Sequence, residues 1–443
     1  MLQHPAYFLG AQPGLGKTSI TLAAAQVLLD ADAIDAVLVI APLHVVYNVW
    51  PSEVTKWDEF RGLKLVTLHG SQKAKRLKEP ADIYLINPEG LAWLDAQVTA
   101  GNFELPCMLV VDESTKFKNS QSKRFKILRK WIDAFERRYC LTGTPMPNTL
   151  LDLFGQFFIL DGGERLGRYV THFRNKWFFQ SGFGGYTWTP NPGAQAEIEE
   201  RIGDISSFLD ADDLIDMPQL IENKVFVRLP IDVMKRYAQL EDEFLIEVKG
   251  ATILARNGGA LTSKLRQLLS GAIYTDEKDW MVLHEAKLDA LASLLADREG
   301  HPTLVGYEFR HSLAQMEERF GKQYRCGYAG AGVSAGRVKA TIEAWNRGEI
   351  DVLFAHPASL GHGVNLQSAG DCVIWYGPTY DFELHDQFVR RVYRQGQKKR
   401  VIVHTIMVPG TIDELVYAVL GRKERSQRGL IDAIKAQAEK HRA

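Results

Sequence analysis

Residues 10–18 read GAQPGLGKT and stand between the apolar run 7–9 and the helix-prone segment 19–29. A short buried strand, a glycine-rich turn and a helix are therefore expected in immediate succession. Glycines let the backbone wrap so that successive N–H groups point at one anion, and the positive N-terminal end of a helix adds to the attraction. The stretch predicts a phosphate-binding loop.

Within this loop the residue types suggest individual roles. Lys17 is expected to reach the β and γ phosphates of a nucleotide, and the hydroxyl of Thr18 to bind Mg²⁺. ATP and Mg²⁺ are accordingly the predicted cofactors. The predicted nucleotide-binding residues of the loop are Gly14, Leu15, Gly16, Lys17, Thr18 and Ser19.

Short runs rich in Val, Ile and Leu alternate with helix-like stretches on both sides of the middle of the chain. This alternation predicts an α/β fold with two buried parallel sheets. The runs of the first half are residues 7–9, 36–41, 63–68, 83–86, 108–111 and 139–141. Those of the second half are residues 302–307, 324–328, 351–355, 372–376 and 401–407.

The sequence between these two halves has a different character. It is aromatic and glycine-rich at residues 177–188 and helical in pattern over 231–295. We therefore predict an N-terminal lobe of residues 1–215, with an insertion after about residue 150, and a C-terminal lobe of residues 216–443. The second lobe is expected to carry the helical insertion and a helical tail, and the boundary is placed near residues 216–222.

Two carboxylates follow the apolar run that ends at Val111. Charges at the end of a buried strand cost free energy unless a metal or a partner balances them. In a phosphate-loop enzyme Asp112 would hold Mg²⁺, and Glu113 would orient or deprotonate the attacking water. The alternative is a helix N-cap, which an Asp-Glu pair provides as readily when it is considered alone.

Three later motifs extend the pattern. Residues 141–145 read LTGTP, residues 361–366 read GHGVNL, and residues 387–397 read QFVRRVYRQGQ. The i, i+3 spacing of Arg391 and Arg394 predicts that one helix face presents both guanidinium groups, as an arginine finger requires. Considered alone, the first motif could be a plain turn and the third an ordinary Arg-rich surface helix.

Together these motifs resemble the ordered motifs of Swi/Snf-type ATPases, a branch of helicase superfamily two. The resemblance covers nearly the whole chain and implies two RecA-like lobes with helical insertions, ATP hydrolysis in the cleft, and tracking along one strand of a duplex. The predicted catalytic residues are Lys17, Asp112, Glu113, Gln387, Arg391 and Arg394, and Gly363 joins the nucleotide-binding set.

The chain departs from the family pattern in three places. Ser114 and Thr115 stand where the family has alanine and histidine, so the coupling role of that histidine is unfilled or reassigned. Little chain precedes Ala11, which leaves the upstream adenine-recognition element missing or abbreviated, and Leu360 replaces a common glycine. These features favour a compact microbial or viral motor over a nucleosome remodeller.

Double-stranded DNA is the predicted partner, contacted through its backbone without regard to sequence. A formal net charge of −1 does not argue against this, because a motor needs only a local basic track. The candidate contacts lie on loops at strand ends: His44, Asn48, His69, Lys116, Lys118, Asn148, Ser359 and His362. A strand-separating helicase with a wedge at residues 177–188, an RNA-dependent ATPase and a non-motor nucleotide switch remain alternatives.

The composition points to a cytoplasmic protein. No apolar run approaches the length of a membrane span, and the N-terminus lacks the features of a secretory signal. The four cysteines are scattered, without the paired spacing of a zinc site or a disulfide framework. We expect a monomer that does not associate with membranes.

Overall fold

The computed structural model describes residues 1–181, 187–209, 217–250, 255–275, 279–330, 332–360 and 364–440. The chain divides into two compact units, one comprising Met1–Ile215 with Lys423–Ala443 and the other Asp216–Arg422. The helical tail after residue 422, which the sequence prediction assigns to the second lobe, thus groups with the first unit. Within the described residues, no helix is both long and apolar enough to cross a membrane.

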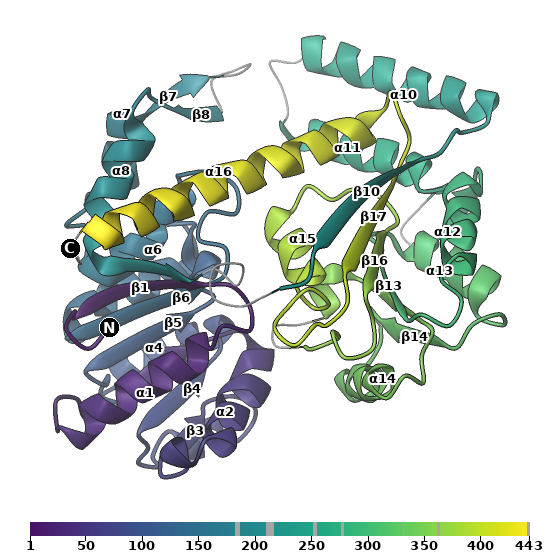
Figure 1. Cartoon of the computed structure of the whole chain (residues 1–443). Coiled ribbons are helices and arrows are strands. Elements are labelled where there is room, and N and C mark those ends of the chain that lie inside the picture. Colours follow the sequence, from purple (N-terminus) through teal and green to yellow (C-terminus); the bar gives the residue numbers. More distant parts are fainter. Residues whose placement is uncertain are drawn as a thin grey trace. The chain divides into compact units, whose positions relative to one another are not determined.

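The described part of the first unit is built on a seven-stranded sheet in the order β3-β4-β2-β5-β6-β1-β9, whose paired strands all run parallel (Figure 1). The strands are β1 Ala6–Ala11, β2 Val37–Ile40, β3 Leu65–Thr67, β4 Ile83–Ile86, β5 Met108–Asp112, β6 Arg137–Thr142 and β9 Ser206–Leu209. All but β9 coincide with the apolar runs read from the sequence. The strand order places β5, β6 and β1 side by side, so the ends that carry the predicted site are neighbours.

Helices cover both faces of this sheet. They are α1 Lys17–Asp30, α2 Trp50–Lys56, α3 Lys73–Arg76, α4 Leu91–Thr99, α5 Lys123–Trp131, α6 Asp152–Asp161, α7 Val170–Trp177 and α8 Ala194–Ile202. Alternate residues of each strand face opposite ways, so Val39 packs in a cluster with α1 and α2 while Ile40 packs with α4, α5 and α6. The aromatic insertion forms the hairpin β7 Phe178–Ser181 and β8 Thr187–Pro190.

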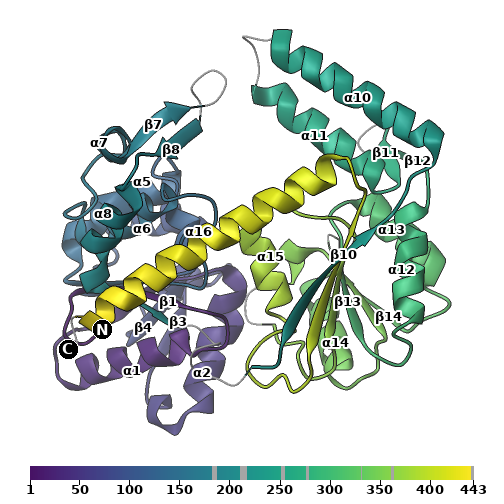
Figure 2. The ribbon, with the colours of Figure 1, turned by 45° about the horizontal axis from the view of Figure 1, so that its top comes forward.

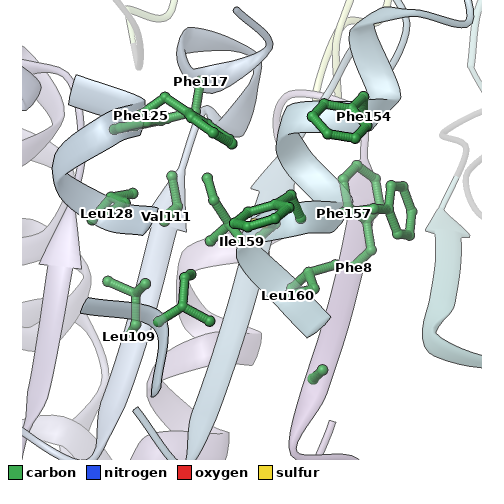
Figure 3. Close-up of a cluster of buried hydrophobic side chains, with 14 of the residues drawn as sticks. Phe8, Leu109, Val111, Phe117, Phe125, Leu128, Phe154, Phe157, Ile159 and Leu160 are labelled. Carbon is green, nitrogen blue, oxygen red and sulfur yellow. The ribbon is translucent and has the colours of Figure 1, made fainter. Parts of the chain in front are cut away.

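The core on the α6 face is dominated by large side chains. Phe154, Phe157 and Ile159 of α6 gather over β1 and β5, and the rings of Phe8 and Phe157 stack with centroids 5.0 Å apart (Figure 3). Phe117 lies in the same cluster and is fully buried. This cluster fixes α6 against the segment that follows β5, at the carboxyl edge of the sheet.

The second unit repeats the architecture with the sheet order β10-β17-β16-β13-β15-β14, again parallel throughout (Figure 2). Its strands are β10 Leu220–Phe226, β13 Thr303–Gly306, β14 Cys326–Ala329, β15 Val352–Ala355, β16 Cys372–Trp375 and β17 Val401–Met407. The helices are α10 Ile231–Gly250, α11 Ala255–Leu269, α12 Ala286–Ala296, α13 Arg310–Phe320, α14 Ala335–Asn346, α15 Phe382–Val389 and the part of α16 Ile412–Lys440 up to Arg422. The sequence prediction of an α/β fold with two parallel sheets is therefore confirmed.

Two elements of this unit differ from the prediction. The segment read as helical over residues 231–295 is interrupted by the antiparallel hairpin β11 Ala272–Tyr274 and β12 Trp280–Val282. The predicted boundary region contributes β10, which pairs with β17 along its whole length. Both were missed because their strands are short or carry charged residues instead of a continuous apolar run.

Candidate functional site

The predicted strand, glycine loop and helix are all present at the start of the first unit. β1 ends at Ala11 and α1 begins at Lys17. Gly14 and Gly16 have φ angles of 97° and 77°, in the left-handed region that glycine adopts without a Cβ penalty. A Cβ on Gly16 would also lie 2.9 Å from Ser19 Oγ. The loop therefore has the tight backbone curvature that directs N–H groups toward an anion.

Lys17 folds back over this loop. Its Nζ donates a hydrogen bond of 2.7 Å to the carbonyl of Ala11. The turn after β6 lies alongside, because a Cβ on Gly143 would be 3.3 Å from Pro13 Cδ and 3.8 Å from Lys17 Nζ. The LTGTP motif is therefore in contact with the phosphate loop, which a plain surface turn would not require.

Asp112 ends β5 and is held in a buried position. It is 5% exposed, and the indole N–H of the fully buried Trp50 donates to its Oδ2 at 3.1 Å. The backbone N–H of Glu113 donates to the other oxygen, Oδ1, at 3.0 Å. Both carboxylate oxygens are thus oriented by the protein, and Trp50 is a contributor that the sequence motif did not single out for this role.

Glu113 has an unusual backbone. Its φ of 54° is left-handed, a conformation that costs a residue other than glycine roughly 1 kcal/mol or more. It stands at the N-cap position of the 3₁₀ helix η4, Ser114–Phe117, but its side chain makes no capping hydrogen bond. The N-cap interpretation of the Asp-Glu pair therefore loses its support. Strain of this kind is commonly retained where chemistry takes place.

A Mg²⁺ site would draw on the residues at this edge. In the parallel register Asp112 is opposite Leu141, and Thr142 is opposite Gly10, so the carboxyl ends of β5, β6 and β1 meet. Thr18, in the first turn of α1, is 9% exposed. A carboxylate and a hydroxyl on neighbouring segments are the hard oxygen ligands that Mg²⁺ prefers, so the residues present fit the ion.

The arginine motif of the second unit differs from the prediction in its local structure. α15 ends at Val389, so Arg391 and Arg394 lie in turns after the helix and not on one helix face. That part of the prediction is wrong. The Gln397 side chain donates to the carbonyls of Val392 and Gly370, at 3.2 Å and 3.0 Å, and so holds the chain after the helix in a compact turn. Gln387 does lie in α15, where its Nε2 donates to Glu383 at 3.3 Å.

Both arginines form hydrogen bonds with residues 364–366, Arg391 through its backbone and Arg394 through its side chain. Arg391 is 4% exposed, and its carbonyl accepts a hydrogen bond from the N–H of Leu366. Arg394 Nη1 donates to the side chain of Asn365 and to the carbonyl of Val364, and burial lowers the pKa of Arg394. The arginines and the GHGVNL motif are therefore neighbours. Gly361, His362 and Gly363 of that motif lie outside the described residues.

Three predicted nucleic-acid contacts gather on one surface of the first unit. Asn48 Nδ2 donates to the carbonyl of His44 at 3.1 Å. The neighbouring Tyr47, 46% exposed, lies with its hydroxyl 2.9 Å from His69 Nδ1, and the two rings meet edge to face. Polar and aromatic groups on an exposed surface are suited to contacts with phosphates and sugars.

A second group of candidates lies near α6. Asn148 is exposed, its backbone N–H donates to Asp152 at 2.7 Å, and its side chain accepts from Lys423 at 2.9 Å. Lys118 is close enough to lower the pKa of Asp152, although burial is the larger effect and the net pKa is raised. Lys116 is exposed on η4, whereas Ser359 belongs to the second unit, at the end of the 3₁₀ turn η8 Pro357–Ser359.

The same sequence matches two protein families. Residues 3–176 match the SNF2-related domain, and residues 286–396 match the helicase conserved C-terminal domain. The phosphate loop, the carboxylates and the LTGTP motif fall within the first match. Arg391 and Arg394 fall within the second.

Curated relatives extend these matches over the whole chain. Putative protein p41 of Acyrthosiphon pisum secondary endosymbiont phage 1 is 34% identical over 95% of this chain and 93% of its own length. The putative ATP-dependent helicase/translocase YwqA of Bacillus subtilis is 24% identical, and the chromatin remodeling factor mit1 of Schizosaccharomyces pombe 26%. The alignment with YwqA covers 87% of this chain but only 42% of YwqA. The alignment with mit1 covers 93% of this chain but only 30% of mit1.

Solved structures of similar chains include the Sulfolobus solfataricus SWI2/SNF2 ATPase core in complex with dsDNA. It is 23% identical with a TM-score of 0.43, and the alignment covers 98% of this chain and 91% of that chain.

Proposed function

Because the chain belongs to the Swi/Snf (SNF2-related) family of ATPases in helicase superfamily two, we propose that it couples ATP hydrolysis to movement along double-stranded DNA. That it is an ATPase of this family follows from the two family matches and the full-length phage relative. Movement along duplex DNA is a more specific activity than ATP hydrolysis, and it is what we propose. Relatives named as a helicase/translocase and a chromatin remodeling factor support it, although the chain spans less than half of each.

The observation that carries the proposal is the arrangement at the carboxyl edge of the first sheet. The phosphate loop, the oriented carboxylate Asp112 and the turn around Gly143 come together there. The left-handed φ of Glu113 and the hydrogen bonds to both oxygens of Asp112 support a catalytic role for this pair. The second parallel-sheet unit carries Arg391 and Arg394, and a motor of this family needs such a second unit with arginine fingers.

Each residue has a proposed role in this mechanism. Lys17 would exchange its hydrogen bond with the carbonyl of Ala11 for phosphate oxygens. Thr18 and Asp112 would hold Mg²⁺, which would supply positive charge to the phosphates. Glu113 orients the attacking water or accepts its proton. Arg391 and Arg394 supply positive charge to the transferred phosphoryl group, an effect worth roughly 10³–10⁵ in rate where it has been measured in other enzymes.

A strand-separating helicase is the second candidate, because the hairpin of β7 and β8 provides an aromatic projection. Phe179 on β7 is 47% exposed, and Arg174 lies over the ring of Trp188. The predicted wedge also includes residues 182–186, which lie outside the described residues. Product analysis on forked duplexes would separate this activity from translocation without unwinding.

The first test is steady-state ATP hydrolysis without nucleic acid and with single-stranded DNA, duplex DNA or RNA. Lys17→Ala serves as the blank, because it removes the phosphate-binding ammonium. Preferential stimulation by duplex DNA, followed by displacement of a triplex-forming strand, is the expected result. Stimulation by single strands or RNA alone would transfer the proposal to the helicase alternatives, and a rate equal to the blank would refute it.

The arginine roles have their own test. Arg391→Ala is expected to lower DNA-stimulated kcat by about 10³-fold or more while ATP binding is retained. Because Arg391 is 4% exposed, the thermal midpoint of the variant must be measured beside its activity. Arg400→Ala, at an exposed arginine in the same region, is the matched control. Normal turnover in Arg391→Ala would remove this residue from the mechanism.

A further inference from the structure

A buried polar connection joins the two segments that follow β5 and β6. Ser114, directly after the Asp-Glu pair, is fully buried, and its Oγ donates to Gln156 Oε1 at 2.7 Å. Gln156 is also fully buried, in the middle of α6. Its Nε2 donates to the carbonyl of Pro145 at 2.8 Å and to the carbonyl of Asp152 at 2.8 Å. One amide therefore bridges the carboxylate segment and the LTGTP motif.

The surroundings make this connection rigid. A Cβ on Gly155 would lie 2.3 Å from the carbonyl oxygen of Phe117 and 3.0 Å from that of Lys118, so the backbones of α6 and η4 are in close contact. Phe154 and Phe157 anchor the same turns of α6 in the core (Figure 3). In a close-packed interior a displacement of one segment is passed to its neighbour instead of being absorbed.

Each end of the connection leads directly to a candidate nucleic-acid contact. Lys118 is four residues after Ser114, and Asn148 is three residues after Pro145. Both lie beside Asp152, whose carboxylate accepts a hydrogen bond from the Asn148 N–H. The positive charge of Lys118 acts to lower the pKa of Asp152. The other end of the Ser114 segment is the strained Glu113. Buried hydrogen bonds thus link Pro145, Gln156 and Ser114. The backbone continues this link from Pro145 to Asn148 and from Ser114 to Glu113.

We propose that Ser114 and Gln156 are positioning residues that transmit DNA occupancy at the loop of Asn148 to Glu113, and that they fill the coupling role of the histidine replaced by Thr115. This inference rests on the proposed function, because it presupposes DNA-stimulated hydrolysis. When DNA moves the loop after Pro145, the Gln156 amide moves with the Pro145 carbonyl and shifts the Ser114 hydroxyl. The backbone of Glu113 follows, which changes the position of its carboxylate toward the water.

The test compares Ser114→Ala, Gln156→Leu and the double variant. Each single change leaves a buried polar partner without its hydrogen bond, so a lower thermal midpoint is expected. The double change replaces both side chains of the pair by apolar groups and is expected to recover part of that loss. Ile159→Val, at a buried apolar position of the same helix, is the matched control for destabilisation alone.

The decisive quantity is the ratio of ATP hydrolysis with duplex DNA to hydrolysis without it. We expect Ser114→Ala, Gln156→Leu and the double variant each to lower this ratio by about tenfold, and the double variant no more than either single change. The KM for ATP should change by less than about twofold. Ile159→Val should keep the wild-type ratio.

Two results would overturn the inference, and they are distinguishable. If the wild type is stimulated by DNA and the double variant is stimulated equally, the pair is only a packing feature and the proposed function stands. If the wild type shows no stimulation by any nucleic acid, the proposed function is refuted, and the coupling role of Ser114 and Gln156 is refuted with it.

Discussion

At Asp112, the buried indole of Trp50 contributes a hydrogen bond of 3.1 Å to a carboxylate that is 5% exposed. A hydrogen bond to a charged group in such a setting contributes about 1.5–3 kcal/mol. Its value for catalysis is directional, because it fixes which oxygen lone pairs remain available to a metal ion. Removing a side chain that hydrogen-bonds to a metal-binding residue commonly lowers metal affinity by about 10–100-fold.

Trp50→Phe should therefore weaken Mg²⁺ use. The ring is kept and the N–H is lost, so the Mg²⁺ concentration for half-maximal ATP hydrolysis should rise by about tenfold with a smaller change in thermal midpoint. A Mg²⁺ titration of the hydrolysis rate measures this. Trp57→Phe is the control, since Trp57 is 42% exposed and its indole donates to Glu53 instead. An unchanged titration in Trp50→Phe would exclude a role for its N–H.

Residues of the site were predictable from sequence where the motif is local. Lys17 and Thr18 sit within nine consecutive residues, and Asp112 directly ends an apolar run. Trp50 and Gln156 are different, because their partners Asp112 and Ser114 are 62 and 42 residues away in the chain. The periodicity of a sequence does not predict a hydrogen bond between a helix and a distant strand or turn, because the bond forms only when the two elements pack together.

At the scale of the structural element, the turn after α15 depends on the side chain of Gln397. Gln397 is 8% exposed, and its Nε2 contacts the carbonyls of Gln367, Gly370 and Val392. Its Oε1 accepts from the N–H groups of Lys398 and Lys399. The side chain thus joins the arginine turn to the segment before β16, and it determines where Arg391 and Arg394 lie.

Gln397→Leu should consequently disorder the arginine turn. It leaves several buried backbone groups without partners, each costing about 1–3 kcal/mol, so the second unit should be destabilised and DNA-stimulated turnover should fall strongly. Thermal denaturation and ATPase rates measure the two effects. Gln395→Leu is the control, since that residue is exposed in the same turn. Retention of both stability and turnover in Gln397→Leu would contradict this account.

Strands were predictable from the sequence when all of their residues are buried. Central strands such as β2 and β15 are buried at all four positions and appear in sequence as continuous apolar runs. β10 is an edge strand with three consecutive exposed residues, and β9 is a four-residue strand containing two serines. The predicted arginine helix was wrong because an i, i+3 spacing does not distinguish a helix from a turn. The structure has a turn there, which the hydrogen bonds of Gln397 hold.

At the scale of the whole molecule, the second unit contains histidines whose burial makes its stability depend on pH. His311 is fully buried between the rings of Tyr274 and Phe309, and burial lowers its pKa to about 4. Burial also lowers the pKa of His385 to about 4 and that of His284. In the unfolded chain a histidine titrates near 6.5. Between these values the unfolded chain binds protons that the folded unit does not, so stability is full above about pH 6.5 and falls toward pH 4.

His311→Phe should reduce this acid sensitivity. A shift from 6.5 to about 4 corresponds to roughly 3 kcal/mol of unfolding free energy lost across that range. The variant should therefore show a flatter dependence of the free energy of unfolding on pH between 7 and about 4.5, measured by denaturant titration. His301→Gln, at an exposed histidine of the same unit, should keep the wild-type slope. An equally steep slope in His311→Phe would assign the sensitivity to other groups.

The strand order of the first unit also has a consequence for biosynthesis. β1 lies between β6 and β9, so the strand that precedes the phosphate loop is flanked by Arg137–Thr142 and Ser206–Leu209. During translation it leaves the ribosome long before either neighbour exists, and its apolar residues with unpaired N–H and C=O groups remain available for wrong pairings. The nucleotide loop can therefore take its final shape only after about two hundred residues have emerged, and a chain interrupted earlier would be a substrate for chaperones or proteases.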